Sequence, residues 1–270
     1  MIELSTALRT GQRIYGTLIV STAPKWPEAA ANSGLDFVFI DTEHIPIGRD
    51  KLSWMCRAYA AKGLPPLVRI PSPCPIAACQ VLDGGARGIV APYVESADQV
   101  RELVAAVKLR PLKGKRAEAA LDDPNTLQPE LKEYLDEFNS GNALVVNIES
   151  VPAIENLEEI LAVPGLDAVL IGPHDLSVSL GIPEQYDDPK FDRAVREIIT
   201  RAREKNIGAG IHFWESMDQE IDWAKAGANL ILHSGDILLF AQTLQNDLKQ
   251  IRQALGDDAP GDGGNSVEAV

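Results

Sequence analysis

Short apolar runs follow a Gly-x-x phrase at four places along the chain. The phrases begin at Gly34, Gly85, Gly165 and Gly227, and the runs after them read FVFID, GIVAPY, AVLIG and LILH. In each case a helix-like stretch ends at the glycine. Glycine tolerates the left-handed conformation in which many helices end, and a buried strand then begins. The recurring phrase therefore predicts alternating helices and strands.

Eight apolar runs in all are predicted strands. They are continuous and rich in β-branched residues, which is typical of parallel strands covered on both faces. The predicted strands are Ile14–Val20, Phe37–Asp41, Leu67–Ile70, Gly88–Pro92, Leu144–Ile148, Ala168–Ile171, Gly208–His212 and Asn229–His233. Helical patterns such as ADQVRELVAAVK and FDRAVREIITRAREKN separate them. Eight such units predict an α/β protein with a closed (β/α)8 TIM barrel.

The turn after the first strand, the long connection before the fifth strand and the C-terminal residues add detail to the predicted fold. The turn after the first strand, STAPKWPE, lacks the glycines of a dinucleotide-binding fold, which excludes that alternative. Residues 109–141 form a long excursion with a basic LRPLKGKR loop and a predicted extra helix at Pro129–Asn139. Residues 1–255 are expected to form a single barrel domain. Residues 256–270 are expected to be a disordered, acidic, Gly-rich tail.

Composition narrows the class of protein. The chain has 270 residues, 45% hydrophobic residues and a formal net charge of −14. A charge of this sign argues against nucleic-acid binding, which requires clustered Lys and Arg. The opening residues MIELSTALRTGQR contain no apolar core of a signal peptide, and no run approaches a membrane span. With three cysteines in no paired spacing, we expect a reduced, cytoplasmic protein without membrane partners.

The candidate chemistry lies where the predicted strands end, because barrels of this kind carry their active sites there. Ionisable and amide side chains gather at these ends: Asp41, Glu43, His44, Arg69, Asn147, Glu149, His174, Asp175, His212 and His233. Isolated charges at such positions would be costly to desolvate. The concentration of carboxylates, imidazoles and a guanidinium therefore predicts a functional site.

Glu149 and Asp175 are the candidate metal ligands. They follow adjacent predicted strands, so their carboxylates are expected to reach a common point. Two carboxylates with open positions suit Mg²⁺ or Mn²⁺, whose octahedral shells retain waters. The alternative is that Glu149 neighbours a helix N-cap and Asp175 caps a short turn.

Arg69, His44 and Asp83 are the candidate catalytic residues. An arginine at a strand end can donate two parallel hydrogen bonds to a carboxylate or an oxyanion of a substrate. The alternative is that Arg69 forms an ion pair with Asp41 or Glu43 that only ties the strands together. His44 is a candidate general base, against the alternative of a packing histidine. Asp83, near the end of the helix before the fourth strand, is a candidate to hold the His44 ring in one tautomer.

Several of these segments together resemble a known family. The segments GLDFVFIDTEH (34–44), LVRIP (67–71), LDGGARGIVAPYVESADQV (82–100), VNIESVPAIENLEEIL (146–161) and LIGPHDLSVSLG (170–181) resemble the HpcH/HpaI aldolases. Members include 4-hydroxy-2-oxoheptanedioate aldolases and 2-keto-3-deoxy-sugar-acid aldolases. The resemblance covers about residues 14–254. It implies a barrel of the phosphoenolpyruvate/pyruvate-binding type and a homohexamer in which neighbouring subunits exchange the last helix.

The resemblance also implies an activity. A class II pyruvate aldolase is a carbon–carbon lyase that reversibly cleaves a 4-hydroxy-2-oxo acid to pyruvate and an aldehyde through a metal-bound enolate. Glu149 and Asp175 would hold the metal, expected to be Mg²⁺ or Mn²⁺ with Co²⁺ or Zn²⁺ as alternatives. Arg69 would stabilise the enolate oxygen, and His44, paired with Asp83, would move the hydroxyl proton. No lysine stands at a predicted strand end, which argues against a class I Schiff-base mechanism.

The remaining implied roles concern substrate binding. The Gly172-Pro173-His174 turn would hold the pyruvate carboxylate, and Asn147 stands where many relatives carry Gln. His212 replaces an aliphatic residue of some members. Together these differences lead to the hypothesis that His174 and His212 favour a polar or anionic aldehyde.

Two other functions stay open at this point. An oxaloacetate decarboxylase would use the same enolate chemistry but would have little use for His44. A non-catalytic barrel acting as a scaffold or ligand sensor would need no metal.

Overall fold

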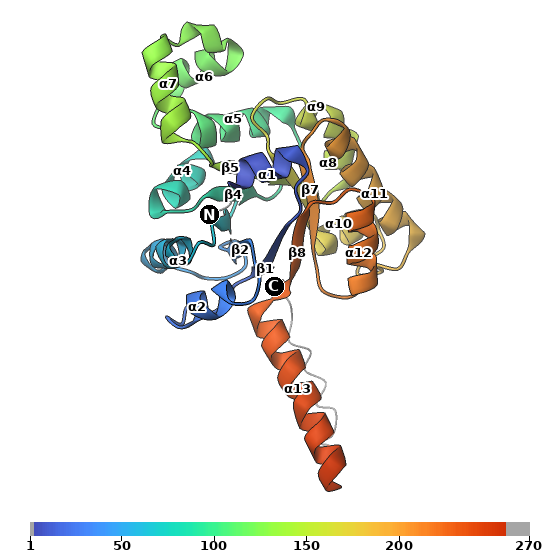
Figure 1. Ribbon diagram of the computed structural model, residues 1–270. Helices are drawn as coiled ribbons and strands as arrows, with labels where there is room; N and C mark the ends of the chain where they lie inside the picture. The colour runs from blue at the N-terminus through green and yellow to red at the C-terminus, as the bar shows by residue number, and fades with distance from the viewer. Residues whose placement is uncertain (1–2, 258–270) are drawn as a thin grey trace.

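A computed structural model describes residues 3–257 of the chain. Its centre is a closed barrel of parallel strands in chain order, in which the first strand also pairs with the last (Figure 1). The strands are β1 (Ile14–Leu18), β2 (Phe37–Asp41), β3 (Pro66–Arg69), β4 (Gly88–Ala91), β5 (Ala143–Asn147), β6 (Ala168–Ile171), β7 (Gly208–Phe213) and β8 (Leu230–Gly235). The predicted (β/α)8 fold is confirmed, and each predicted strand overlaps an observed one.

Helices follow the strands along the chain, and most of them lie around the outside of the barrel (Figure 1). They are α1 (Leu4–Thr10), α2 (Trp26–Ala31), α3 (Arg49–Ala61), α4 (Pro75–Gly84), α5 (Ala97–Lys108), α6 (Gly114–Asp122), the 3₁₀ turn η1 (Pro124–Thr126), α7 (Pro129–Phe138), α8 (Val151–Glu155), α9 (Leu157–Leu161), α10 (Pro173–Ser179), α11 (Pro189–Glu204), α12 (Met217–Lys225) and α13 (Asp236–Leu255). Their starts follow local sequence: Ser96 and Gln99, for example, form a capping box at the start of α5.

The apolar residues divide into two layers because successive strand residues point to opposite faces. Phe37 and Phe39 of β2 belong to the cluster inside the barrel, whereas Val38 and Ile40 pack in the cluster between strands and helices. Leu4 and Leu8 of α1 are buried in the inner cluster, together with residues from the N-terminal parts of the strands. This packing leaves the C-terminal ends of the strands as the place for polar side chains.

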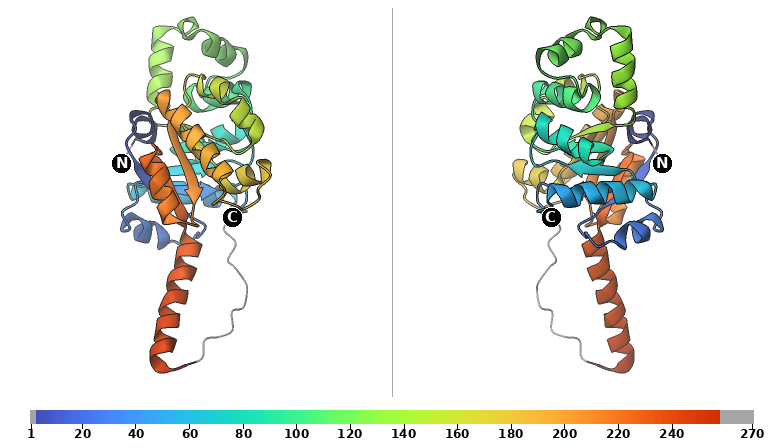
Figure 2. Two further views of the ribbon diagram at one scale, coloured as in Figure 1. Left: turned by 90° about the vertical axis from the view of Figure 1, so that its right-hand side faces the viewer. Right: turned by 90° about the vertical axis from the view of Figure 1, so that its left-hand side faces the viewer.

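The excursion and the tail depart from the regular repeat. The helix predicted at Pro129–Asn139 is present as α7, and the excursion contains a second helix, α6, which the sequence did not reveal. Figure 2 shows that α6 and α7 extend from the end of the barrel opposite α13. The predicted disordered tail lies, apart from Gly256 and Asp257, outside the described residues. Within residues 3–257 no helix is long and apolar enough to cross a membrane.

Helix α13 does not fold back onto its own barrel. It begins directly after β8 and projects away from the strands in all three views (Figures 1 and 2). Only Asp236 and Leu238 of the helix are buried. The outer surface over β8 and β1 is consequently open, and Tyr15 on β1 is 48% exposed.

Candidate active site

Arg69 is tied to two carboxylates at the ends of β2 and β3. The strand register places Asp41 directly opposite Arg69. Arg69 Nε donates to Asp41 Oδ1 over 2.8 Å and Nη2 donates to Oδ2 over 2.6 Å, while Nε also lies 3.1 Å from Glu43 Oε2. Burial raises the pKa of Asp41, but the hydrogen bonds and charge of Arg69 outweigh it and hold that pKa below its usual value. The ion pair that stood as the alternative for Arg69 is therefore formed.

That ion pair still leaves part of the guanidinium available. Nη1 of Arg69 has no protein partner among residues 3–257. The side chain is 10% exposed, and its centre lies 5.7 Å from the centroid of the Phe39 ring. The pairing with Asp41 thus fixes the direction of Arg69 and leaves one nitrogen free to donate.

His44 lies beside Glu43 at the mouth of the barrel, and Asp83 does not reach it within one chain. His44 Nε2 is 3.6 Å from Glu43 Oε2, and its side chain is 42% exposed. Asp83 Oδ1 instead accepts a 2.6 Å hydrogen bond from Arg110 Nη1. Asp83 belongs to the last turn of α4, which leads into the N-terminal end of β4, whereas His44 follows the C-terminal end of β2. The predicted pairing of His44 with Asp83 is not formed within the described chain, because the two residues belong to opposite ends of the barrel.

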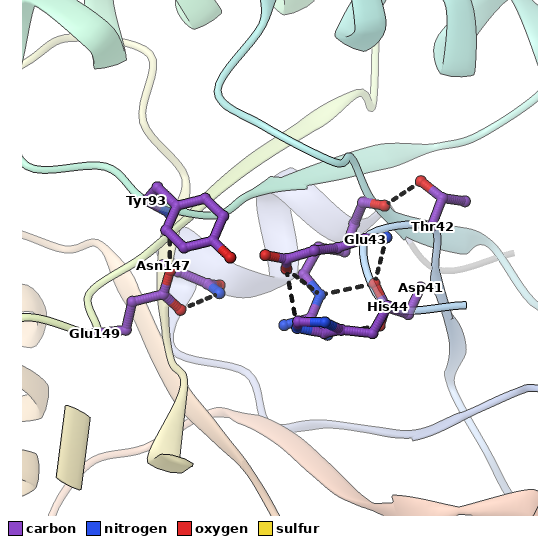
Figure 3. Close-up of polar contacts among 8 residues, drawn as sticks. Asp41, Thr42, Glu43, His44, Tyr93, Asn147 and Glu149 are labelled. Atoms are coloured by element: carbon purple, nitrogen blue, oxygen red, sulfur yellow. Dashed lines mark hydrogen bonds and ion pairs between the residues drawn. The ribbon is translucent and has the colours of Figure 1, made fainter. Parts of the chain in front are cut away.

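Glu149 is buried and held by hydrogen bonds from Tyr93, two residues after β4, and from Asn147, the last residue of β5. The backbone N–H of Tyr93 donates to Oε1 over 2.8 Å, and Asn147 Nδ2 donates to Oε2 over 2.7 Å (Figure 3). Tyr93 adopts φ 54, a left-handed conformation that a tyrosine rarely takes. Its ring extends towards Glu43 (Figure 3), and that carboxylate is the largest cause raising the pKa of Tyr93 to about 12.

Asp175 and Gly172 complete the surroundings of Glu149. Asp175 lies in the first turn of α10, directly after β6. A Cβ atom at Gly172 would lie 2.6 Å from Glu149 Oε2, so only glycine leaves room for this carboxylate. Burial raises the pKa of Glu149; its two hydrogen bonds lower it, and the negative charges of Asp175 and Glu43 raise it further.

These features fit a divalent cation. Burial and neighbouring negative charges make ionised Glu149 unfavourable by itself, and a cation would relieve both effects. Asn147 Oδ1 is buried without a hydrogen-bond partner among the described residues, so a further oxygen is available near the carboxylate. Residues 3–257 contain no group of three or more His, Cys, Asp or Glu side chains arranged to hold a metal. Oxygen donors of this kind suit a divalent cation that keeps open positions rather than a closed structural site.

The two candidate substrate-binding histidines differ in their surroundings. His174 is 60% exposed at its side chain and lies 3.7 Å from Glu184 Oε1, so its imidazole belongs to the surface. His212 is only 8% exposed. Its ring centroid lies 5.8 Å from that of Phe39 and 5.3 Å from that of Trp214. Of the two imidazoles, only that of His212 belongs to the barrel interior.

Some residues of this site were not singled out as functional from the sequence. Sequence position marks Glu43 as a strand-end residue and an alternative partner of Arg69, but it does not reveal that Glu43 contacts both Arg69 and His44. Tyr93 lies two residues after β4, in the segment 82–100 that carries the resemblance, and Ser234 lies near the end of β8. Both residues have positive φ. Their position at the C-terminal end of a strand is the signal that would have found them.

Comparisons with known proteins identify the family and the fold. A family model described as HpcH/HpaI aldolase/citrate lyase matches residues 15–242. A 2-keto-3-deoxy-L-rhamnonate aldolase of Salmonella gallinarum is 34% identical over 247 residues, covering 91% of each chain. The crystal structure of an HpcH/HpaI aldolase from Desulfitobacterium hafniense DCB-2 superposes with a TM-score of 0.80 at 28% identity, covering 96% of this chain and 98% of the other.

A more distant structure shares the fold alone. The citrate lyase beta subunit of M. tuberculosis, complexed with oxaloacetate and magnesium, has a TM-score of 0.53 at 16% identity and covers 84% of this chain and 93% of its own.

Proposed function

Since the chain belongs to the HpcH/HpaI aldolase/citrate lyase family and is a carbon–carbon lyase, we propose that it reversibly cleaves a 4-hydroxy-2-oxo acid to pyruvate and an aldehyde. The observation that carries the proposal is the buried Glu149 carboxylate, packed on Gly172 and repelled by Asp175, at the same barrel mouth as Arg69 and His44. The relative named for its action on 2-keto-3-deoxy-L-rhamnonate supports a sugar-acid-like substrate.

Glu149 and Asp175 would hold the divalent cation. When bound, the cation supplies a Lewis acid for the negative charge that develops on the keto oxygen of the substrate. Tyr93 and Asn147 fix the Glu149 carboxylate from two sides, as hydrogen bonds around a metal ligand generally do. Mg²⁺ or Mn²⁺ fits this oxygen donor set best, and Co²⁺ or Zn²⁺ stays an alternative prediction.

Arg69 would also stabilise the negative charge that develops on the keto oxygen of the substrate. In retro-aldol cleavage the C3–C4 bond breaks and its electron pair moves onto the C2 carbonyl oxygen, which gives the enolate of pyruvate. The free Nη1 of Arg69 is positioned by the Asp41 pair and would donate to that oxygen. Because the guanidinium is already fixed, little reorganisation is needed as the charge forms.

His44 would act as the general base. The proton on the C4 hydroxyl must leave as the C4–O bond becomes the carbonyl of the aldehyde, and a partly exposed imidazole at the mouth is suited to accept it. Glu43, 3.6 Å away, would stabilise the imidazolium that results. The enolate then takes a proton at C3 to give pyruvate. The pyruvate-carboxylate roles predicted for Gly172, Pro173 and His174, and that of Asp83, stay predictions.

The second candidate function is oxaloacetate decarboxylation. The same carboxylates and Arg69 would stabilise the enolate formed when CO₂ leaves, and no hydroxyl proton has to be removed. The two functions therefore differ in their need for His44. A His44→Ala variant of an aldolase would lose cleavage of 4-hydroxy-2-oxo acids more than decarboxylation.

The direct test is exchange of the pyruvate methyl hydrogens with deuterium, followed by NMR with Mg²⁺ or Mn²⁺ and no aldehyde present. We expect the wild type to catalyse exchange, Glu149→Gln to lose most of it, and an exposed control, Glu137→Gln on α7, to keep it. Exchange that survives Glu149→Gln unchanged would contradict the assignment of the metal site.

Helix α13 supports the predicted assembly from several copies of the chain. Its exposed apolar residues recur at helical spacing: Ile237, Phe240, Leu244, Leu248, Ile251 and Leu255. Such a stripe normally packs against another surface, and the barrel leaves its own face over β8 and β1 open. A second copy of the chain would supply and receive this helix, consistent with a homohexamer. The expected cytoplasmic location likewise stays a prediction.

The assembly is tested by the molar mass in solution. Phe240 is 60% exposed, so Phe240→Glu is expected to reduce the mass measured by light scattering without unfolding the barrel. Gln242→Glu, at an exposed polar position of the same helix, is the matched control. A wild-type mass equal to one chain would contradict the assembly.

A further inference from the structure

The hydrogen bonds of His212 fix which of its nitrogens carries a proton. Nε2 lies 2.9 Å from the carbonyl oxygen of Ser234. A carbonyl only accepts hydrogen bonds, so Nε2 must be the protonated nitrogen. In the neutral ring Nδ1 is then an acceptor, and it has no protein partner among the described residues.

The surroundings of His212 keep the ring neutral. The aromatic rings of Phe39 and Trp214 pack against the His212 ring. The Arg69 guanidinium lies over the Phe39 ring. Burial, the dominant cause, lowers the pKa of His212 from 6.5 to about 4; the Ser234 carbonyl and Asp41 raise it, and Arg69 and His233 lower it. At neutral pH the ring therefore offers an acceptor and no positive charge.

The end of β8 departs from regular geometry at the residue that holds His212. The register between β1 and β8 shifts between the pairs Gly16–Leu232 and Leu18–Gly235. Ser234 lies within this irregular segment with φ 52, an unfavourable conformation for a residue with a side chain. Such backbone strain persists where the surrounding structure requires it and is frequent at ligand sites.

Ser234 also carries an unsatisfied group of its own. The residue is 2% exposed, and its Oγ is buried with no hydrogen-bond partner in the described part of the chain. Buried hydroxyls are nearly always paired in native proteins. Ser234 thus accepts from His212 Nε2 through its carbonyl oxygen and carries, in the same residue, a buried hydroxyl without a partner among the described residues.

We propose that His212 Nδ1 and the Ser234 hydroxyl form an acceptor subsite that binds a hydroxyl group of the aldehyde, and that this subsite selects neutral hydroxyaldehydes over unsubstituted or carboxylated ones. A substrate hydroxyl donates to Nδ1 and accepts from the Ser234 hydroxyl, and an unsubstituted aldehyde leaves both groups unpaired. A carboxylate accepts from Ser234 but has no proton to donate to Nδ1. The inference rests on the proposed aldolase function and narrows the expectation of a polar or anionic aldehyde to a hydroxylated one.

The test compares aldehydes in the addition direction, with pyruvate and Mg²⁺. Glycolaldehyde carries the hydroxyl, acetaldehyde lacks it, and glyoxylate carries a carboxylate. The readout is the ratio of kcat/KM values for two aldehydes within one preparation, which is independent of the fraction of active enzyme. We expect the wild type to favour glycolaldehyde over both others, and His212→Leu to lower the glycolaldehyde-to-acetaldehyde ratio by about 10-fold.

Further variants distinguish the subsite from a general effect of substitution. Ser234→Ala keeps the backbone carbonyl and removes the hydroxyl, so it should lower the ratio by a smaller factor. His212→Asn keeps an oxygen acceptor near the place of Nδ1 and should retain part of the preference. His233→Leu, a histidine on the outer face of β8 that pairs with Glu220 over 2.7 Å, should leave the ratio at the wild-type value.

The outcomes separate the inference from the proposed function. An unchanged ratio in His212→Leu, or a wild type that prefers acetaldehyde or glyoxylate, overturns the subsite while methyl-hydrogen exchange in pyruvate still supports the aldolase. A wild type without metal-dependent exchange overturns the proposed function itself.

Discussion

Gly172→Ala tests the metal site through one methyl group. The new Cβ would lie 2.6 Å from Glu149 Oε2, whereas ordinary contact begins at 3.4 Å, so the carboxylate would have to move by about 0.8 Å. Its hydrogen bonds from Tyr93 and Asn147, at 2.8 and 2.7 Å, would then lengthen or break. The backbone of Gly172, at φ −85, accepts alanine without strain.

The expected effect is a loss of metal affinity with little loss of folding. Disturbing the groups that orient a metal ligand typically costs about 10- to 100-fold in affinity, or roughly 1.4 to 2.7 kcal/mol. The assay is a calorimetric titration of the protein with Mn²⁺ alone, beside thermal unfolding in EDTA. Gly84→Ala is the matched control, since its nearest neighbour is 3.8 Å away. Wild-type Mn²⁺ affinity in Gly172→Ala would refute the assignment of Glu149.

Three further predictions concern charge. The pKa of His212 in the folded protein lies below 6.5, so the unfolded chain binds more protons than the folded one between pH 4 and 6.5. The free energy of unfolding therefore falls as the pH decreases through this range. In urea unfolding, His212→Leu should remove this part of the pH dependence, which amounts to at most about 3 kcal/mol. Glu220 raises the pKa of His233, so Glu220→Gln should lower it in an NMR titration; an unchanged value would exclude the pairing. Arg69→Lys cannot form both bonds to buried Asp41 and should lower the urea-unfolding free energy by about 1–3 kcal/mol; unaltered stability would mean that the pair contributes nothing.

The fold followed from the sequence because its signals are local and repeated. Glycine at a helix end and a β-branched run after it recur along the chain, and eight strands with intervening helices have few ways to close. Helix α6 was missed because the segment GKRAEAALD follows a basic loop and buries only Ala117 and Ala120. Its buried residues are alanines, so no large apolar side chain marks the buried face.

The sequence predicted the positions of the candidate side chains better than their contacts. Strand-end position alone brought Arg69 and Glu149 to the barrel mouth. The pairing of His44 with Asp83 is not formed within one chain, because sequence spacing does not reveal which end of the barrel a helix terminus reaches; between copies of the chain it stays a prediction. The tautomer of His212 depends on the Ser234 carbonyl. The direction of that carbonyl depends on the irregular end of β8, where Ser234 has φ 52. Neither composition nor hydrophobic period predicts this irregularity.

The most direct test of the central claim is pyruvate release from a panel of 4-hydroxy-2-oxo acids and from oxaloacetate, with Mg²⁺ or Mn²⁺ and then with EDTA. We predict pyruvate release from at least one 4-hydroxy-2-oxo acid, and we expect EDTA to abolish this release and added metal to restore it. Release from oxaloacetate alone, or release that EDTA leaves unchanged, would contradict it.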